Sequence, residues 1–253
     1  MIQHFRFGSP IRTDSVVQDI PVSSDAVPFL TADADGWVYT MAPDAIVYGL
    51  GEMPRGINKR GWHYVANNTD ESHHGENKVS YYGAHNFLLI DGGPGGDLFG
   101  VFVDFPGKVH YDIGYTVHDT LRFATEEPDY ELYILTGADP NDIAHQFRQL
   151  IGRSYIPPKW AFGLQQSRWG YKTAEDVREV ARQYKENDLP LDMICMDIDY
   201  MQDYADFTIN KERFPDLAAL AAELKAQGIR LVPIIDAGVR IDPEEPTCTE
   251  GLE

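Results

Sequence analysis

The sequence has little cysteine, few basic residues and no long apolar run. Its two cysteines, Cys195 and Cys248, provide neither a disulfide framework nor the ligand spacing of a zinc site. No stretch approaches the roughly 18 consecutive apolar residues that a membrane helix requires. The opening residues MIQHFRFGSP lack the apolar centre of a secretory signal. These absences favour a cytoplasmic protein that is not embedded in a membrane.

Basic residues are far outnumbered, with 21 Lys and Arg against 40 Asp and Glu and a formal net charge of −19. Such an acidic surface repels the phosphates of nucleic acids and the anionic headgroups of membranes, so we expect neither as a partner. The 253 residues are 43% hydrophobic and 12% aromatic, which is enough to bury a core. The composition therefore indicates a globular rather than a disordered protein.

Residues 35 to 136 alternate apolar with polar side chains in short runs that are separated by Gly, Pro and Asp. This pattern predicts a series of antiparallel strands that form a sandwich. The glycine-rich segment DGGPGGDLFG lies between two such runs. A phosphate-binding loop would need a helix directly after it, and a strand follows instead, so we predict a hairpin turn there.

The pattern changes after Gly137. Asp139 and Pro140 are typical of the start of a helix, and apolar residues then recur at helical spacing up to Gly152. The segment SYIPPKW follows, and its two prolines mark a domain boundary near residue 155. We therefore predict a sandwich domain over residues 1–154 and a second domain over residues 155–253.

The second domain alternates predicted strands with predicted helices. The strands are WAFGLQQS, LDMICMD and IRLVPIID; one helix is capped by Thr173, and another lies in FPDLAALAAELKAQG and ends at Gly228. Such a βαβαβ order predicts a parallel sheet, either doubly wound or the beginning of a (β/α)8 barrel. No GxGxxG motif follows the first strand, so nucleotide binding has no support.

Polar and aromatic residues follow each predicted strand of this domain, namely Trp169, Asp197, Asp199 and Asp236. In a (β/α)8 barrel, ligands bind at the face formed by the carboxyl ends of the strands. A single acid there is as often a loop cap as a binding group. Recurrence after three strands favours a binding site.

Three interpretations of Asp197 and Asp199 compete. They could form a divalent-metal site, with His73 and His74 as further ligands, although adjacent histidines are better explained as solvated loop residues. They could be the paired carboxylates of a glycosidase, because residues i and i+2 of a strand share a face, but such neighbours approach a sugar from one side only. We prefer the third interpretation, in which Asp197 accepts hydrogen bonds from sugar hydroxyls while Trp169 packs on the ring.

Several motifs together resemble glycoside hydrolase family 31, and specifically its α-glucosidases. They occur in collinear order between about residues 46 and 240 and are VYGLGE, NKRGW, YYGAHNF, GRSYIPPKWAFGLQQSRWGY, DMICMDIDYM, FTINKERFPD and LVPIIDAG. The resemblance implies a galactose-mutarotase-like β-sandwich followed by the first βαβαβ part of a (β/α)8 TIM barrel. It also implies a retaining enzyme that releases α-linked glucose from the non-reducing ends of oligosaccharides.

Site residues are implied by the same resemblance. The aspartate that contacts glucose hydroxyls corresponds to Asp197, with Ile198 beside it, and the aromatic wall corresponds to Trp169. The third strand supplies an apolar contact, Ile234, and a following acid, Asp236. A loop of the sandwich supplies a further acid, which corresponds to Glu71 with Asp70 immediately before it; glutamate departs here from the usual aspartate.

The family's nucleophile lies in a W-x-D-M-N-E-like motif, and neither this motif nor the acid/base residue is found in the sequence. We therefore expect these residues to form the N-terminal part of a longer enzyme. They should contain no catalytic residue and should not hydrolyse a glycoside on their own. No metal or other cofactor is implied, and family members of this kind often form homo-oligomers. The alternatives that stay open are a non-catalytic carbohydrate-binding protein and a family-31 α-xylosidase.

Overall fold

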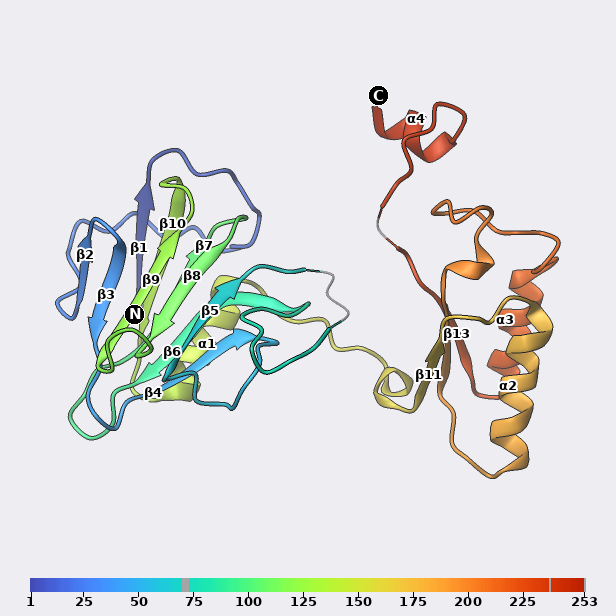
Figure 1. The fold of residues 1–253 in the computed structure, drawn as a ribbon, viewed down its shortest axis with the longest axis horizontal. Coiled ribbons are helices and arrows are strands. Elements are labelled where there is room, and N and C mark those ends of the chain that lie inside the picture. Colours follow the sequence, from blue (N-terminus) through green and yellow to red (C-terminus); the bar gives the residue numbers. More distant parts are fainter. Residues whose placement is uncertain (70–72, 237, 253) are drawn as a thin grey trace. The chain divides into compact units, whose positions relative to one another are not determined.

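The computed structural model describes residues 1–69, 73–236 and 238–252, which form two compact units, Met1–Ser154 and Tyr155–Glu253 (Figure 1). Each unit has its own hydrophobic core. Among the described residues, no helix combines the length and the apolar character needed to span a membrane.

The first unit is built from two five-stranded antiparallel sheets, which confirms the predicted sandwich. One sheet has the order β1-β10-β7-β6-β4, with strands at Ile2–Phe7, Tyr130–Thr136, Leu98–Asp104, Ala84–Asp91 and Ile46–Gly51. The other has the order β2-β3-β9-β8-β5, with strands at Leu30–Asp33, Gly36–Thr40, Thr120–Thr125, Val109–Ile113 and Trp62–Ala66.

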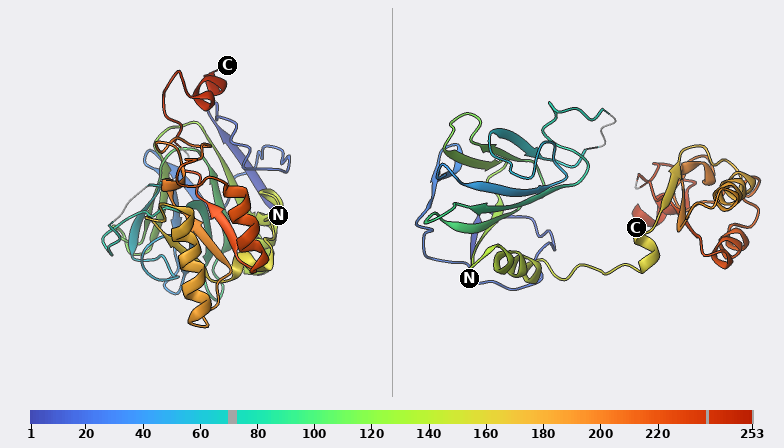
Figure 2. Two further views of the ribbon diagram at one scale, coloured as in Figure 1. Left: turned by 90° about the vertical axis from the view of Figure 1, so that its right-hand side faces the viewer. Right: turned by 90° about the horizontal axis from the view of Figure 1, so that it is seen from below.

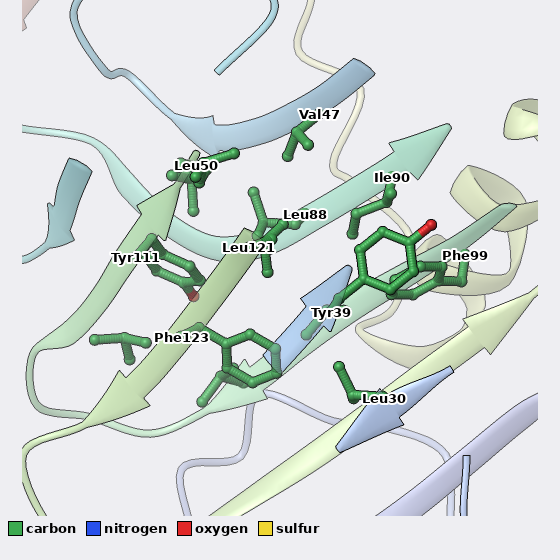
Figure 3. Packing of buried hydrophobic residues seen from close by; sticks show 14 of the residues in the cluster. Leu30, Tyr39, Val47, Leu50, Leu88, Ile90, Phe99, Tyr111, Leu121 and Phe123 are labelled. Atoms are coloured by element: carbon green, nitrogen blue, oxygen red, sulfur yellow. The ribbon is translucent and has the colours of Figure 1, made fainter. Parts of the chain in front are cut away.

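The core of the sandwich comes from alternate residues on the facing sides of both sheets (Figure 3). Val47, Leu88 and Phe99 come from one sheet, whereas Tyr111 and Phe123 come from the other, and all are at most 1% exposed. Removal of these side chains from water supplies the main favourable contribution to folding of this unit.

Two strands precede the region in which strands were predicted. β1 pairs with β10 along its whole length, from Ile2 opposite Leu135 to Phe7 opposite Tyr130. The apolar pattern of β1 is interrupted by His4, which is 4% exposed and whose Nδ1 lies 2.7 Å from the carbonyl oxygen of Ile20. A polar residue in a buried position breaks the apolar alternation by which a strand is predicted from sequence. Strand β1 was therefore missed.

The glycine-rich segment is the turn of the β6–β7 hairpin, as predicted. The amide of Gly92 donates to the carbonyl oxygen of Asp97 at 2.9 Å, which closes the turn. Gly93 and Gly95 have φ angles of 73° and 81°, in the left-handed region that favours glycine. The glycines therefore serve the backbone of the turn.

Helix α1 (Pro140–Leu150) begins where the sequence predicts and covers the outer side of the first sheet, against β6, β7 and β10 (Figure 2). The Asp139 side chain caps it by accepting from the amide of Asp142 at 2.9 Å. A Cβ at Gly100 of β7 would lie 2.8 Å from Cγ2 of Ile143, so the close approach of helix and sheet requires glycine there.

The second unit contains a parallel sheet with the order β11-β12-β13, as predicted. Its strands are Gln165–Arg168, Met193–Met196 and Arg230–Pro233. The first strand is shorter than predicted, because Lys159–Phe162 forms a 3₁₀ turn, η1, in which the amide of Ala161 donates to the carbonyl oxygen of Pro158 at 2.9 Å. A final helix, α4, spans Pro246–Leu252.

Helices α2 (Ala174–Glu186) and α3 (Leu217–Ala226) pack with this sheet around one core (Figure 1). Thr173 caps α2 as predicted, in a reciprocal capping box with Asp176. Leu220 and Leu224 of α3 are fully buried. The helices bury one face of the sheet. Because side chains alternate along a strand, this also determines which side chains point to the opposite face.

Replacement of Ile90 by Ala should lower the free energy of unfolding of the sandwich by about 2–5 kcal/mol, because it leaves a cavity in a packed core. Ile11 is a matched control, since its side chain is 73% exposed and that of Ile90 is 0% exposed. Urea unfolding followed by circular dichroism measures both variants. Equal small losses for Ile90→Ala and Ile11→Ala would contradict the core position of Ile90.

Candidate functional site

The parallel register sets one edge of the three-stranded sheet. Arg168, Met196 and Pro233, the last residues of their strands, lie beside one another across the sheet. The residues that follow them therefore leave the sheet at the same edge. These residues include Trp169, Asp197, Ile198, Ile234 and Asp236, which are the barrel residues predicted to contact a sugar.

These residues are exposed or half-buried in this chain. The Trp169 side chain is 67% exposed and that of Ile234 is 40% exposed, while Asp236 is exposed and Asp197 and Ile198 are half-buried. The edge thus offers an aromatic face beside carboxylates, which is a combination suited to a polyhydroxylated ring.

Asp197 sits at the turn between β12 and the 3₁₀ turn η2 (Ile198–Tyr200). One of its carboxylate oxygens, Oδ1, accepts from the amide of Ile198 at 2.8 Å. This single local bond orients the carboxylate and leaves further lone pairs for hydroxyl donors. The geometry is therefore compatible with the predicted binding role of Asp197.

Asp199 has a different environment, and the expectation that Asp197 and Asp199 share the face of one strand is wrong. The strand ends at Met196, and the chain then turns through η2, which carries Asp199 into the protein, where it is 3% exposed. Its Oδ1 lies 3.9 Å from Nη1 of Arg213, and its Oδ2 has no hydrogen-bond partner among the described residues. Asp199 is a buried structural acid rather than a partner of Asp197.

The histidines considered as metal ligands are exposed. His74 packs on the rings of Tyr81 and Tyr82, with ring centroids 5.0 and 5.5 Å apart. Within residues 1–69, 73–236 and 238–252, no group of three or more His, Cys, Asp or Glu side chains is arranged to hold a metal ion. The predicted sandwich contacts Asp70 and Glu71 lie outside the described residues.

Sequence reasoning missed Tyr200, which joins two parts of this edge. Its side chain is 4% exposed, and its hydroxyl donates to the carbonyl oxygen of Ile234 at 2.8 Å. Burial, with a smaller contribution from the charge of Asp206, raises the pKa of Tyr200 above its ordinary value, so the hydroxyl remains a donor at neutral pH. A tyrosine directly after the DID segment was the available signal, but its partner could not be read from the sequence.

Replacement of Arg213 by Met should lower the stability of the second unit by about 1–2 kcal/mol, because the buried carboxylate of Asp199 loses its nearest cation. Lys211→Met is the control, since Lys211 is an exposed cation two residues earlier. Addition of Asp199→Asn to Arg213→Met should restore much of the loss, because a neutral amide costs less to bury. Thermal melts measure all variants, and additive losses in the double variant would contradict the coupling.

Both units match domains of one enzyme family. Residues 19–112 match the Glycosyl hydrolase 31 N-terminal galactose mutarotase-like domain, and residues 154–253 match the Glycosyl hydrolases family 31 TIM-barrel domain. These matches agree with the observed sandwich and parallel sheet, the latter being part of a TIM barrel.

Individual relatives give the same result. The chain is 40% identical over 207 residues to alpha-glucosidase 2 of Bacillus thermoamyloliquefaciens. The matched region is 81% of this chain and 26% of that protein. It is 32% identical over 219 residues to intestinal sucrase-isomaltase of Homo sapiens. That matched region is 85% of this chain and 12% of the human protein.

A solved GH31 dextranase of Flavobacterium johnsoniae, complexed with isomaltotriose, superimposes with a TM-score of 0.69 at 26% identity, over 83% of this chain and 25% of that one. The chain thus spans about a quarter of the length of the Bacillus and Flavobacterium proteins. Through its mutarotase-like sandwich and its part of a TIM barrel, the chain belongs to glycosyl hydrolase family 31.

Proposed function

We propose that these residues are part of a retaining α-glucosidase, an enzyme that releases α-linked glucose from the non-reducing ends of oligosaccharides. The observation that supports this proposal is the register of the parallel sheet, because Trp169, Asp197 and Asp236 follow the carboxyl ends of its three strands. In a (β/α)8 barrel, ligands bind at this end of the strands. The names of the relatives, an alpha-glucosidase and a dextranase complexed with isomaltotriose, support α-linked glucose as the sugar.

Each residue of the edge has a role in this proposal. The carboxylates of Asp197 and Asp236 accept hydrogen bonds from glucose hydroxyls, which are stronger than bonds to neutral acceptors because the acceptor is charged. The indole of Trp169 covers an apolar face of the ring, and Ile198 and Ile234 provide apolar contacts beside it.

A retaining mechanism needs a nucleophile and an acid/base residue about 5 Å apart, on either side of the scissile bond. Asp197 and Asp199 do not provide this pair, because η2 separates their directions and Asp199 is buried. We therefore propose that both catalytic carboxylates come from parts of the enzyme outside these 253 residues, in keeping with the 26% of the Bacillus relative that the chain spans. No metal or cofactor takes part in this proposal.

In the full-length enzyme that contains these residues, Asp197→Asn should lower kcat/KM for a nitrophenyl α-glucoside by about 10- to 100-fold, the value of a hydrogen bond to a charged group. Asparagine keeps the acceptor for the amide of Ile198, so local structure is preserved. Asp188→Asn is the control, because Asp188 is exposed and precedes β12 rather than following it.

Three results would contradict the proposal in different ways. Near-normal kcat/KM for Asp197→Asn would remove the assigned role of Asp197. Faster hydrolysis of the α-xyloside than of the α-glucoside would replace glucose by xylose as the sugar. Saturable sugar binding without turnover by the full-length protein would favour a carbohydrate-binding protein.

A further inference from the structure

The position of Asp236 is set by the backbone on either side of it. Asp236 is exposed, and its carboxylate forms no hydrogen bond or ion pair with any of the described residues. The direction of a carboxylate without such bonds depends on how firmly the backbone of its residue is held in place. The contacts of the neighbouring residues therefore decide where this acid points.

On one side, Ile234 is held by two hydrogen bonds. Its amide donates to the carbonyl oxygen of Met196 at 2.9 Å, which continues the pairing of β12 and β13 by one residue. Its carbonyl oxygen accepts from the buried hydroxyl of Tyr200 at 2.8 Å. The second bond ties the loop after β12 to the chain that leads to Asp236.

On the other side, the amide of Gly238 donates to two oxygens. It donates to the carbonyl oxygen of Asp236 at 2.5 Å and to Oδ2 of Asp206 at 3.3 Å, and Asp206 is 5% exposed. Its other oxygen, Oδ1, has no hydrogen-bond partner within the described part of the chain. Burial of a carboxylate is energetically unfavourable, so we expect Asp206 to have a specific role beside this amide.

The loop that carries Tyr200 and Asp206 is itself fixed. The amide of Asn210 donates to the carbonyl oxygen of Tyr200 at 2.8 Å, and the Thr208 hydroxyl donates to the carbonyl oxygen of Ala205 at 2.6 Å. The non-glycine residues Asp203, Tyr204 and Phe207 have φ angles of 51°, 60° and 63° in the same loop. Such angles are unfavourable for these residues and persist only where the surrounding contacts impose them.

We propose that Tyr200 and Asp206 are positioning residues, which clamp the backbone on both sides of Asp236 and so aim its carboxylate at the bound sugar. This inference rests on the proposed function, in which Asp236 contacts glucose. It assigns the buried hydroxyl and the buried carboxylate of this loop a role at the site without direct contact with substrate. Because a shift of about 1 Å in a binding group can cost about 100-fold in rate, loss of one clamp should be measurable.

The test is a double-mutant cycle of Tyr200→Phe and Asp236→Asn in the full-length enzyme, with kcat/KM for a nitrophenyl α-glucoside as the readout. Tyr200→Phe alone should lower kcat/KM about 10-fold, and it should have no further effect when Asp236 is already Asn. Tyr184→Phe is the control, because it also removes a hydroxyl of the second unit, one that donates to Oε1 of Gln166 at 2.6 Å. This control should keep the activity of the wild type.

Hydrogen–deuterium exchange of the 253-residue chain tests the clamp without any assay of activity. The amide of Ile234 should exchange faster in Tyr200→Phe, and that of Gly238 faster in Asp206→Ala, than in the wild type or Tyr184→Phe. Unchanged exchange, or losses of activity that add in the cycle while the wild type is active, would overturn this inference alone. A wild-type enzyme without activity on α-glucosides would overturn the proposed function, and this inference with it.

Discussion

The hydrogen-bond register of β11, β12 and β13 is the constraint on which the site depends. It places the last residues of the three strands side by side, so that residues far apart in the sequence leave the sheet at one edge. The register is maintained because α2 and α3 bury one face of the sheet, and a slip of one residue would turn the apolar side chains of Ile194 and Met196 away from that core. Packing on one face thus determines which side chains are presented at the edge.

The two acids of the DID segment show how sharply a short turn can separate chemical roles. Asp197 remains half-buried with one bond to a neighbouring amide, whereas Asp199 is enclosed and faces Arg213. Only the first can accept hydrogen bonds from a ligand without reorganisation of the loop. The second belongs to the support of the loop, together with Tyr200 and Asp206, whose bonds reach the end of the neighbouring strand.

Features that depend on local chemistry could be predicted from the sequence. The caps at Asp139 and Thr173, the glycine hairpin and the order of parallel strands all follow from residues close together in the chain. Strand β1 could not be predicted, because it is defined by pairing with β10, more than a hundred residues away. The premise that Asp197 and Asp199 share one face of a strand was wrong, because periodicity does not reveal where a strand gives way to a 3₁₀ turn.

We propose that α-linked glucose binds at the carboxyl edge of this parallel sheet. A crystal structure of the full-length enzyme with isomaltose tests it most directly. We expect glucose hydroxyls within hydrogen-bond distance of the carboxylates of Asp197 and Asp236, and the sugar ring against the indole of Trp169. Well-ordered sugar bound elsewhere, with these three side chains in contact only with water, would contradict it.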